Sequence, residues 1–205
     1  NRLHQGQITT ENLTIIEGDI FEEKYYAEHL IDATHLLILN ADTGTGISFL
    51  TPYHSTNYNS NILSFLIEKI KKYNNDLSQL SVIFTSSRAV YGEGVWACSK
   101  HGEVEIYRSK YLAEKNISCP FCAAQLTLTG TCENDRTDPL SVYGANKLFS
   151  ENLLKLLLVD EVRKLIILRP QNVYGLGQSR RNPYTGLINW FSESLINHED
   201  IEIYE

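Results

Sequence analysis

The sequence has no methionine, only five prolines and no apolar stretch long enough to cross a bilayer, which takes about 20 residues. We therefore expect no membrane association. Basic residues are also scarce, since 18 Lys and Arg stand against 25 Asp and Glu, which gives a formal net charge of −7. A broad basic face for nucleic acid is accordingly not expected, although a local arginine pair could still hold phosphate.

The chain opens at Asn1 without a basic-then-apolar secretory leader, and we interpret it as a piece of a longer reading frame. All four cysteines fall between Cys98 and Cys132, a distribution unlike the disulfide framework of a secreted domain. A cytoplasmic protein is therefore expected. With 205 residues, of which 42% are apolar and 21% charged, the chain resembles an average globular domain and can bury a core.

Four short apolar runs are continuous rather than alternating, as is typical of strands buried on both faces of a parallel sheet. They are residues 13–16, 36–39, 82–84 and 165–168. The segments 57–72 and 146–158 carry apolar residues at helical spacing, and 187–196 predicts a further short helix. Because strands and helices alternate, the sequence predicts an α/β fold with a doubly wound parallel sheet.

The stretch 92–139 interrupts this alternation and is too long for an ordinary connection, so we expect a small insert with its own support. It contains the pairs Cys98-x-x-His101 and Cys119-x-x-Cys122, separated by 17 residues. Two such pairs are typical of a zinc ribbon, in which four protein ligands leave no open position and the metal is structural. Free thiols, a disulfide or a lost metal site are the alternative interpretations.

Tyr143 and Lys147 stand four residues apart near a predicted helix start, so their side chains share one helical face. A neighbouring ammonium favours the ionised phenol, whose pKa must fall by roughly 3 units, or about 4 kcal/mol, for it to act as a base at neutral pH. A second positive charge, such as oxidised nicotinamide, would have to contribute. This spacing is common by chance, and its alternative interpretation is a solvated helix face.

Three hydroxyl residues, Thr85, Ser86 and Ser87, follow the predicted strand 82–84, at the edge where open α/β sheets place their ligands. A hydroxyl at this position can hydrogen-bond a substrate oxygen. Alternatively, these side chains only satisfy backbone groups at the strand end.

Three motifs, in this order after consecutive predicted strands, resemble those of extended short-chain dehydrogenase/reductases. They are Thr85-Ser86-Ser87-Arg88-Ala89-Val90-Tyr91-Gly92, Tyr143-x-x-x-Lys147 and Leu168-Arg169-Pro170-Gln171-Asn172-Val173-Tyr174-Gly175. Within that superfamily the chain resembles the NAD-dependent epimerase/dehydratase family, which acts on nucleotide sugars. The resemblance covers nearly all 205 residues and implies a Rossmann-like doubly wound sheet, incomplete at both ends, with a small Cys-rich insert.

The resemblance implies a role for each matching residue. In the catalytic set, Tyr143 would transfer the proton, Lys147 would hold the nicotinamide ribose and lower the tyrosine pKa, and Ser87 would bind the reacting hydroxyl. The residues implied to bind the cofactor, NAD, are Asp19, Ile20, Asn40, Ala41, Asp42, Asn57, Tyr143, Lys147 and Pro170. Those implied to bind the nucleotide-sugar substrate are Ser87, Arg88, Asn172, Gln178, Arg180, Arg181 and Tyr184. A solvated loop is the alternative for the pair of arginines at 180–181.

Two positions separate this chain from other members of the resembled family. Dehydratases carry an Asp-Glu pair, and decarboxylases a glutamate, where this sequence has Arg88 and Ala89. Neither residue can donate and accept protons in those reactions, which leaves epimerisation at the sugar C4 hydroxyl as the expected activity. The alternatives are a sugar-nucleotide ketoreductase or dehydratase that uses NAD(P), and a non-catalytic Rossmann-like binding protein.

The expected domain organisation follows from the same resemblance. Residues 1–174 would form the NAD-binding domain without its first strand and Gly-rich loop, with 94–137 as the insert, and 175–205 would start the substrate-binding region. The insert is similar to a Cys/His insert of bacterial rhamnose-type 4-epimerases, and a homodimer is implied by the family alone. The acidic residue that selects NAD over NADP should precede Asn1.

Overall fold

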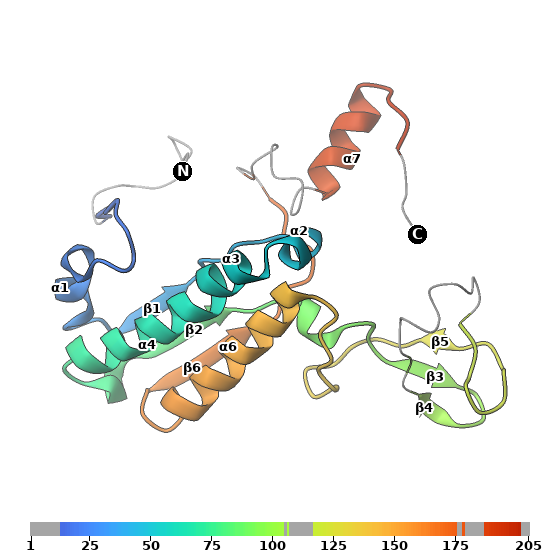
Figure 1. Ribbon diagram of the computed structural model, residues 1–205, viewed down its shortest axis with the longest axis horizontal. Coiled ribbons are helices and arrows are strands. Elements are labelled where there is room, and N and C mark those ends of the chain that lie inside the picture. Colours follow the sequence, from blue (N-terminus) through green and yellow to red (C-terminus); the bar gives the residue numbers. More distant parts are fainter. Residues whose placement is uncertain (1–12, 105, 107–116, 176–177, 179–186, 202–205) are drawn as a thin grey trace.

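The computed structural model describes residues 13–104, 106, 117–175, 178 and 187–201 (Figure 1). Outside the insert the elements are η2 (Glu23–Tyr25), α1 (Ala27–Leu30), β1 (His35–Ile38), α2 (Thr45–Leu50), α3 (Pro52–Thr56), η3 (Asn57–Asn61), α4 (Ile62–Tyr73), η4 (Leu77–Gln79), β2 (Ser81–Thr85), η5 (Arg88–Tyr91), α6 (Val142–Leu158), β6 (Lys164–Leu168) and α7 (Leu187–Ile196). The insert contains β3 (Trp96–Cys98), β4 (Gly102–Val104) and β5 (Thr127–Leu128). No helix within the described ranges combines the length and the apolar character that a bilayer span requires.

Strands β1, β2 and β6 form a parallel sheet in the order β1-β2-β6. The register pairs Ser81 with His35 on one side and with Lys164 on the other. Both crossovers step in the same direction across the sheet, and right-handed crossovers then put their helices on the same face. Figure 1 shows α3, α4 and α6 side by side over one face of this sheet. The expected α/β fold with a parallel sheet is confirmed.

The hydrophobic core lies between this sheet and its helices. The fully buried side chains that meet there include Leu63, Ile67 and Ile70 of α4, Val82 and Phe84 of β2, and Leu154 and Leu158 of α6. Burying one such side chain contributes about 1.5–3 kcal/mol to folding. The core therefore holds α6 firmly against β2, and the first turn of α6 comes to lie beside the carboxyl end of that strand.

Two expectations about the apolar runs are wrong in the structure. Residues 13–16 form no strand and Ile15 is 65% exposed, because among the described residues no strand lies beside them to share backbone hydrogen bonds. The other three runs form strands, but Leu37 and Leu168 are exposed because side chains alternate and only their strand neighbours face the helices. In the described part of the chain, helices cover one face of the sheet rather than both.

Two helices begin earlier than expected. The helix predicted over 57–72 starts at Pro52, since α3, η3 and α4 form one continuous run and proline suits a first helical position. The helix predicted over 146–158 is α6, whose start is set by Ser141, because its Oγ accepts a hydrogen bond from the Gly144 backbone N–H at 2.9 Å. The last expected helix coincides with α7.

The Cys-rich stretch forms a second, antiparallel sheet in the order β4-β3-β5. Its small buried core consists of Cys98, Val104, Cys119 and Leu126. Figure 1 shows this sheet set apart from the parallel sheet, beyond the N-terminal end of α6. A backbone hydrogen bond of 3.0 Å from Asp138 to Val90 ties the chain leaving the small sheet to η5, which precedes it.

Candidate active site

An open cavity of about 570 Å³ lies at the carboxyl ends of the parallel strands, the edge at which open α/β sheets bind ligands. The loops after β1, β2 and β6 line it, together with the start of α6 and one residue of α7. Its volume falls in the range of small-molecule sites. The lining residues that the sequence had singled out are Ala41, Ser87, Arg88, Tyr143, Lys147, Pro170 and Asn172.

Ser87 occupies the turn directly after β2. Its Oγ accepts a hydrogen bond from the Ala89 backbone N–H at 3.1 Å and so caps η5. Ser87 and Tyr143 line the same cavity, and the Ser87 hydroxyl acts to lower the pKa of the phenol. The Arg88 backbone N–H donates to the Pro170 carbonyl oxygen at 3.1 Å, which joins the chain segments that follow β2 and β6. Ser87 therefore caps the backbone, and its side chain also lines the cavity.

Tyr143 stands in the first turn of α6, opposite Ser87. Burial raises the pKa of the Tyr143 phenol above its ordinary value, and the nearby Ser87 hydroxyl offsets this rise only in part. The expected net lowering by Lys147 is not observed, because desolvation dominates. Gly144 permits the close approach of α6 to the loop after β2, since a Cβ there would lie 2.6 Å from the Ala89 carbonyl oxygen.

Lys147 lies one helical turn further along α6 and is only 2% exposed. Its ammonium donates to the Thr85 carbonyl oxygen at 2.8 Å and lies 5.9 Å from the centroid of the Tyr143 ring. Burial lowers the pKa of Lys147 from 10.5 to about 8. At neutral pH the group is therefore a buried cation at the wall of the cavity, and it stands next to the phenol as the helical spacing predicted.

A buried ion pair that the sequence analysis missed lies one turn beyond Lys147. Glu151 is fully buried and accepts hydrogen bonds from Arg169 Nε at 2.9 Å, Arg169 Nη2 at 2.6 Å and Ser86 Oγ at 2.5 Å. Burial alone would raise the pKa of Glu151, but Arg169 and Ser86 outweigh it and lower the pKa. Arg169 also donates to the Tyr91 hydroxyl at 2.8 Å. The sequence did hold a signal for Glu151, because it lies four residues after Lys147 and so shares its face of α6.

Other predicted ligand residues do not line the cavity. They are Asp19, Ile20, Asn40, Asp42, Asn57 and Gln178. The Asp19 carboxylate accepts a hydrogen bond from the Phe21 backbone N–H at 2.9 Å, and Gln178 Nε2 donates to the Val173 carbonyl oxygen at 3.1 Å. Three further predicted residues lie outside the described part of the chain, namely Arg180, Arg181 and Tyr184.

Asn59, two residues after the predicted cofactor residue Asn57, hydrogen-bonds the loop after β1. Asn59 Nδ2 donates to the carbonyl oxygens of Asp42 at 3.1 Å and Ser55 at 2.8 Å. Asn57 instead accepts a hydrogen bond from Asn61 Nδ2 at 3.2 Å on the exposed side. The helical phase could have identified Asn59, because it lies three and four residues before two buried apolar positions of α4.

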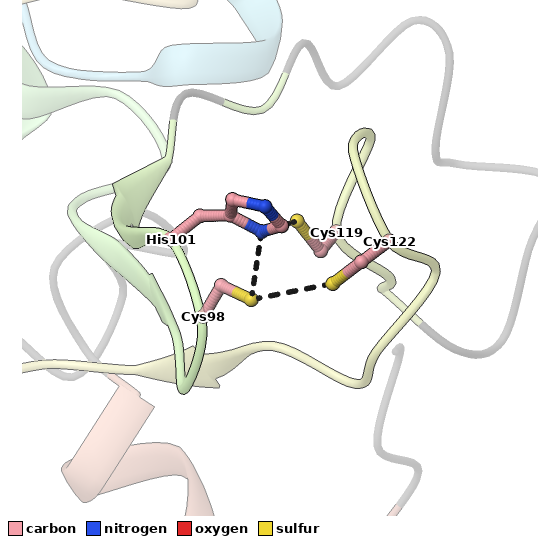
Figure 2. Close-up of side chains that lie close together, drawn as sticks. All are labelled: Cys98, His101, Cys119 and Cys122. Atoms are coloured by element: carbon pink, nitrogen blue, oxygen red, sulfur yellow. Dashed lines mark hydrogen bonds between the residues drawn. The ribbon is translucent and has the colours of Figure 1, made fainter.

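Figure 2 shows Cys98, His101, Cys119 and Cys122 pointing toward one another from two loops of the insert. Their ligand atoms all lie within 4.8 Å of one another. The Lys100 backbone N–H hydrogen-bonds the Cys98 sulfur and is the largest cause that lowers the pKa of this thiol to about 6. The structure thus brings together the four predicted metal ligands, and as free thiols the cysteines do not match the disulfide alternative.

Comparisons with known proteins agree with this geometry. The sequence profile of the NAD dependent epimerase/dehydratase family matches residues 2–205. The chain is 34% identical over 199 residues to a dTDP-L-rhamnose 4-epimerase of Burkholderia thailandensis, covering 95% of this chain and 53% of the relative.

Solved structures of similar fold include a UDP-N-acetylglucosamine 4-epimerase of Methanobrevibacter ruminantium M1 in complex with UDP-N-acetylmuramic acid. That match has 25% identity and a TM-score of 0.68, and it covers 96% of this chain and 51% of that chain. A UDP-glucose 4-epimerase of Thermotoga maritima matches with 22% identity and a TM-score of 0.66, covering 98% and 56%. These likenesses confirm the expected Rossmann-like fold.

The chain spans about half the length of these proteins. The family profile nevertheless extends over almost all of its residues and includes every motif that forms the cavity wall. The chain therefore belongs to the NAD-dependent epimerase/dehydratase family.

Proposed function

We propose that the whole protein is an NAD-dependent nucleotide-sugar 4-epimerase. The observation that carries this proposal is that Ser87, Tyr143 and the buried ammonium of Lys147 line one cavity at the strand ends. The names of two relatives support it, since one is a dTDP-L-rhamnose 4-epimerase and the other a UDP-N-acetylglucosamine 4-epimerase.

The cavity wall fits a nicotinamide cofactor. Lys147 uses one ammonium hydrogen for the Thr85 carbonyl oxygen, and among the described residues no other acceptor takes the remaining two, which suit ribose hydroxyls. In this proposal Lys147 and Tyr143 hold the nicotinamide ribose, and Ala41 and Pro170 line the same cavity. When bound, NAD would take a hydride from the sugar C4 and return it to the opposite face.

The chain's own residues supply the proton transfer. Ser87 Oγ already accepts a hydrogen bond from Ala89, so its hydroxyl hydrogen can be donated to the sugar C4 oxygen. Tyr143 removes the C4 hydroxyl proton and gives it back after the sugar has turned. Because burial raises the phenol pKa, this step needs positive charge beside the phenol, and the proposal assigns that charge to Lys147 and to oxidised nicotinamide.

The residues after Ser87 favour epimerisation over dehydration. Arg88 and Ala89 both line the cavity, in the place where dehydration would need a second acid and base. A guanidinium such as that of Arg88 offers only hydrogen-bond donors, and Ala89 carries no proton to transfer. Arg88 suits a different task, because a guanidinium binds phosphate oxygens in two-point fashion.

The proposal is tested with the full-length protein, NAD and a panel of dTDP- and UDP-hexoses. Tyr143→Phe should lower turnover by about 100-fold or more, because a general base is lost. Tyr53→Phe is the matched control, since Tyr53 is 82% exposed and outside the cavity, and it should keep full turnover. Equal turnover of Tyr143→Phe and wild type would contradict the proposal.

The same experiment separates the alternatives. Net consumption of reduced cofactor would identify a sugar-nucleotide ketoreductase, because an epimerase returns the hydride it removes. Failure of the full-length protein to bind NAD or any nucleotide sugar would identify a non-catalytic binding protein.

A homodimer is part of the proposal. Phe149 and Leu156, seven residues apart on α6, are 52% and 81% exposed, and exposed apolar stripes of this kind mark protein contacts. Light scattering of the full-length protein should give twice the mass of one chain, and Leu156→Glu should shift it toward one.

A further inference from the structure

The four metal-type side chains of the insert are arranged as two pairs that meet face to face. Cys98 and His101 stand at the turn between β3 and β4, and Cys119 and Cys122 stand in the loop that leads to β5 (Figure 2). Cys98 and Cys119 are 3% and 2% exposed, respectively. Each pair therefore contributes one buried sulfur, so the cluster is not a grouping of surface side chains alone.

Three of the six distances between the ligand atoms lie close to the edges of a tetrahedron around zinc, and all six are within 4.8 Å. Zn–S bonds of about 2.3 Å and Zn–N bonds of about 2.05 Å imply S···S edges of about 3.8 Å and S···N edges of about 3.6 Å. The sulfur of Cys98 lies 3.6 Å from His101 Nδ1 and 3.6 Å from the Cys122 sulfur, and the Cys119 sulfur lies 3.5 Å from Nδ1. A disulfide would need about 2.05 Å.

Backbone hydrogen bonds form a tight turn around the second pair, and this turn brings Cys122 close to Cys119. The Ala123 N–H donates to the Cys119 carbonyl oxygen at 2.8 Å, and the Cys119 N–H donates to Ala124 at 2.7 Å. Ala123 adopts a φ of 56°, a left-handed conformation that costs a residue with a Cβ about 1 kcal/mol or more. This strained residue lies in the turn that brings the Cys119 and Cys122 sulfurs together.

Within the described residues, the apolar core of the insert is small. Four buried side chains form it, two of them the ligands Cys98 and Cys119, and partly buried side chains such as Trp96 pack against it. Small units with so little apolar burial depend on a metal or a disulfide for stability. These cysteines are free thiols at separations that suit ligands of one metal ion and are too long for a disulfide.

We propose that Cys98, His101, Cys119 and Cys122 bind one structural Zn²⁺ that folds the insert. Three thiolates and one imidazole form a donor set that favours zinc over hard cations such as Mg²⁺ or Ca²⁺. Bound as three thiolates and one neutral imidazole, the zinc and its ligands carry a net charge of −1. With four protein ligands the metal has no open position and takes no part in the sugar chemistry.

Two described hydrogen bonds join the chain leaving the insert to the catalytic unit. Asp138 donates its backbone N–H to the Val90 carbonyl oxygen at 3.0 Å, and Arg169 donates from Nη1 to the Glu133 carbonyl oxygen at 3.2 Å. The core under α4 and α6 shares none of these residues. Loss of zinc should therefore unfold the insert locally while the NAD-binding unit stays folded.

Metal analysis of the purified full-length protein tests the proposal. About one zinc per chain is expected in the wild type, and close to none in Cys119→Ser. Cys132→Ser is the matched control, because Cys132 is an exposed free thiol outside the cluster, and this variant should keep the zinc. A wild type without zinc after purification in zinc-supplemented medium, iron in place of zinc, or unchanged zinc in Cys119→Ser would each overturn the proposal.

A second measurement does not depend on whether the variant folds. Zinc is removed from the wild type with a chelator and replaced by Co²⁺, whose visible spectrum reports its ligands. Intense ligand-field bands with sulfur-to-cobalt charge transfer are expected for a tetrahedral thiolate site, and a weak octahedral spectrum would overturn the proposal. Protease cleavage confined to 94–137 in the chelated protein, with NAD binding retained, would show the local role, and loss of NAD binding would contradict it.

Discussion

Lys147 is a charge that the fold buries at a cost to stability, and the cost can be measured through its pH dependence. Its pKa falls from 10.5 to about 8 because burial desolvates the ammonium. Between these values the unfolded chain holds the proton and the folded chain releases it, so the free energy of unfolding rises with pH. The loss of folding free energy caused by the buried charge is full at pH values below 8 and decreases as the pH rises toward 10.5.

The magnitude follows from the two pKa values. At pH 7 the buried charge lowers the free energy of unfolding by about 3 kcal/mol, and at pH 9.5 by about 1.4 kcal/mol. Wild type should therefore gain about 2 kcal/mol over this range relative to a variant without the charge. Lys147→Met is that variant, because methionine keeps the length of the side chain and has no ionisable group.

Urea unfolding of full-length wild type and Lys147→Met at several pH values gives the difference directly. The lost hydrogen bond to Thr85 adds a constant, whereas the buried charge adds the slope, so the two effects separate. Lys147→Met should also lose the proposed epimerase activity at every pH. This result would show that the destabilising buried charge of Lys147 is needed for activity. A difference that stays constant between pH 7 and 9.5 would refute the reasoning.

Two further substitutions test the packing around the site, each by urea unfolding. Glu151→Gln should lower the free energy of unfolding by about 3 kcal/mol, because the guanidinium of Arg169 loses its buried counter-charge. Lys155→Gln is the control: it removes only a half-exposed partner of Glu151 and should lower the free energy of unfolding by less than about 1 kcal/mol. Similar losses in both would contradict the assignment. Gly144→Ala should cost about 1–3 kcal/mol because its Cβ meets a carbonyl oxygen at 2.6 Å, and Gly46→Ala, with nothing within 4 Å, should cost none; comparable destabilisation by the two would refute the close-approach argument.

The places where sequence reasoning failed share a physical cause. Residues 13–16 have the composition of a buried strand, yet a strand exists only where a neighbour shares its hydrogen bonds. Leu37 and Leu168 are apolar like their neighbours, and only the position of the helices decides which of them is buried.

Local chemistry by itself determined the strands and helices that form the site, and it placed Tyr143 beside Lys147, because helical periodicity acts over one turn. It also singled out the two Cys/His pairs of the insert. Only the tertiary structure decided that Ser87 meets Tyr143, that Glu151 pairs with Arg169, and that burial sets the Lys147 pKa near 8. These features depend on contacts between distant segments and on how completely they exclude water, and no local pattern of residues carries that information.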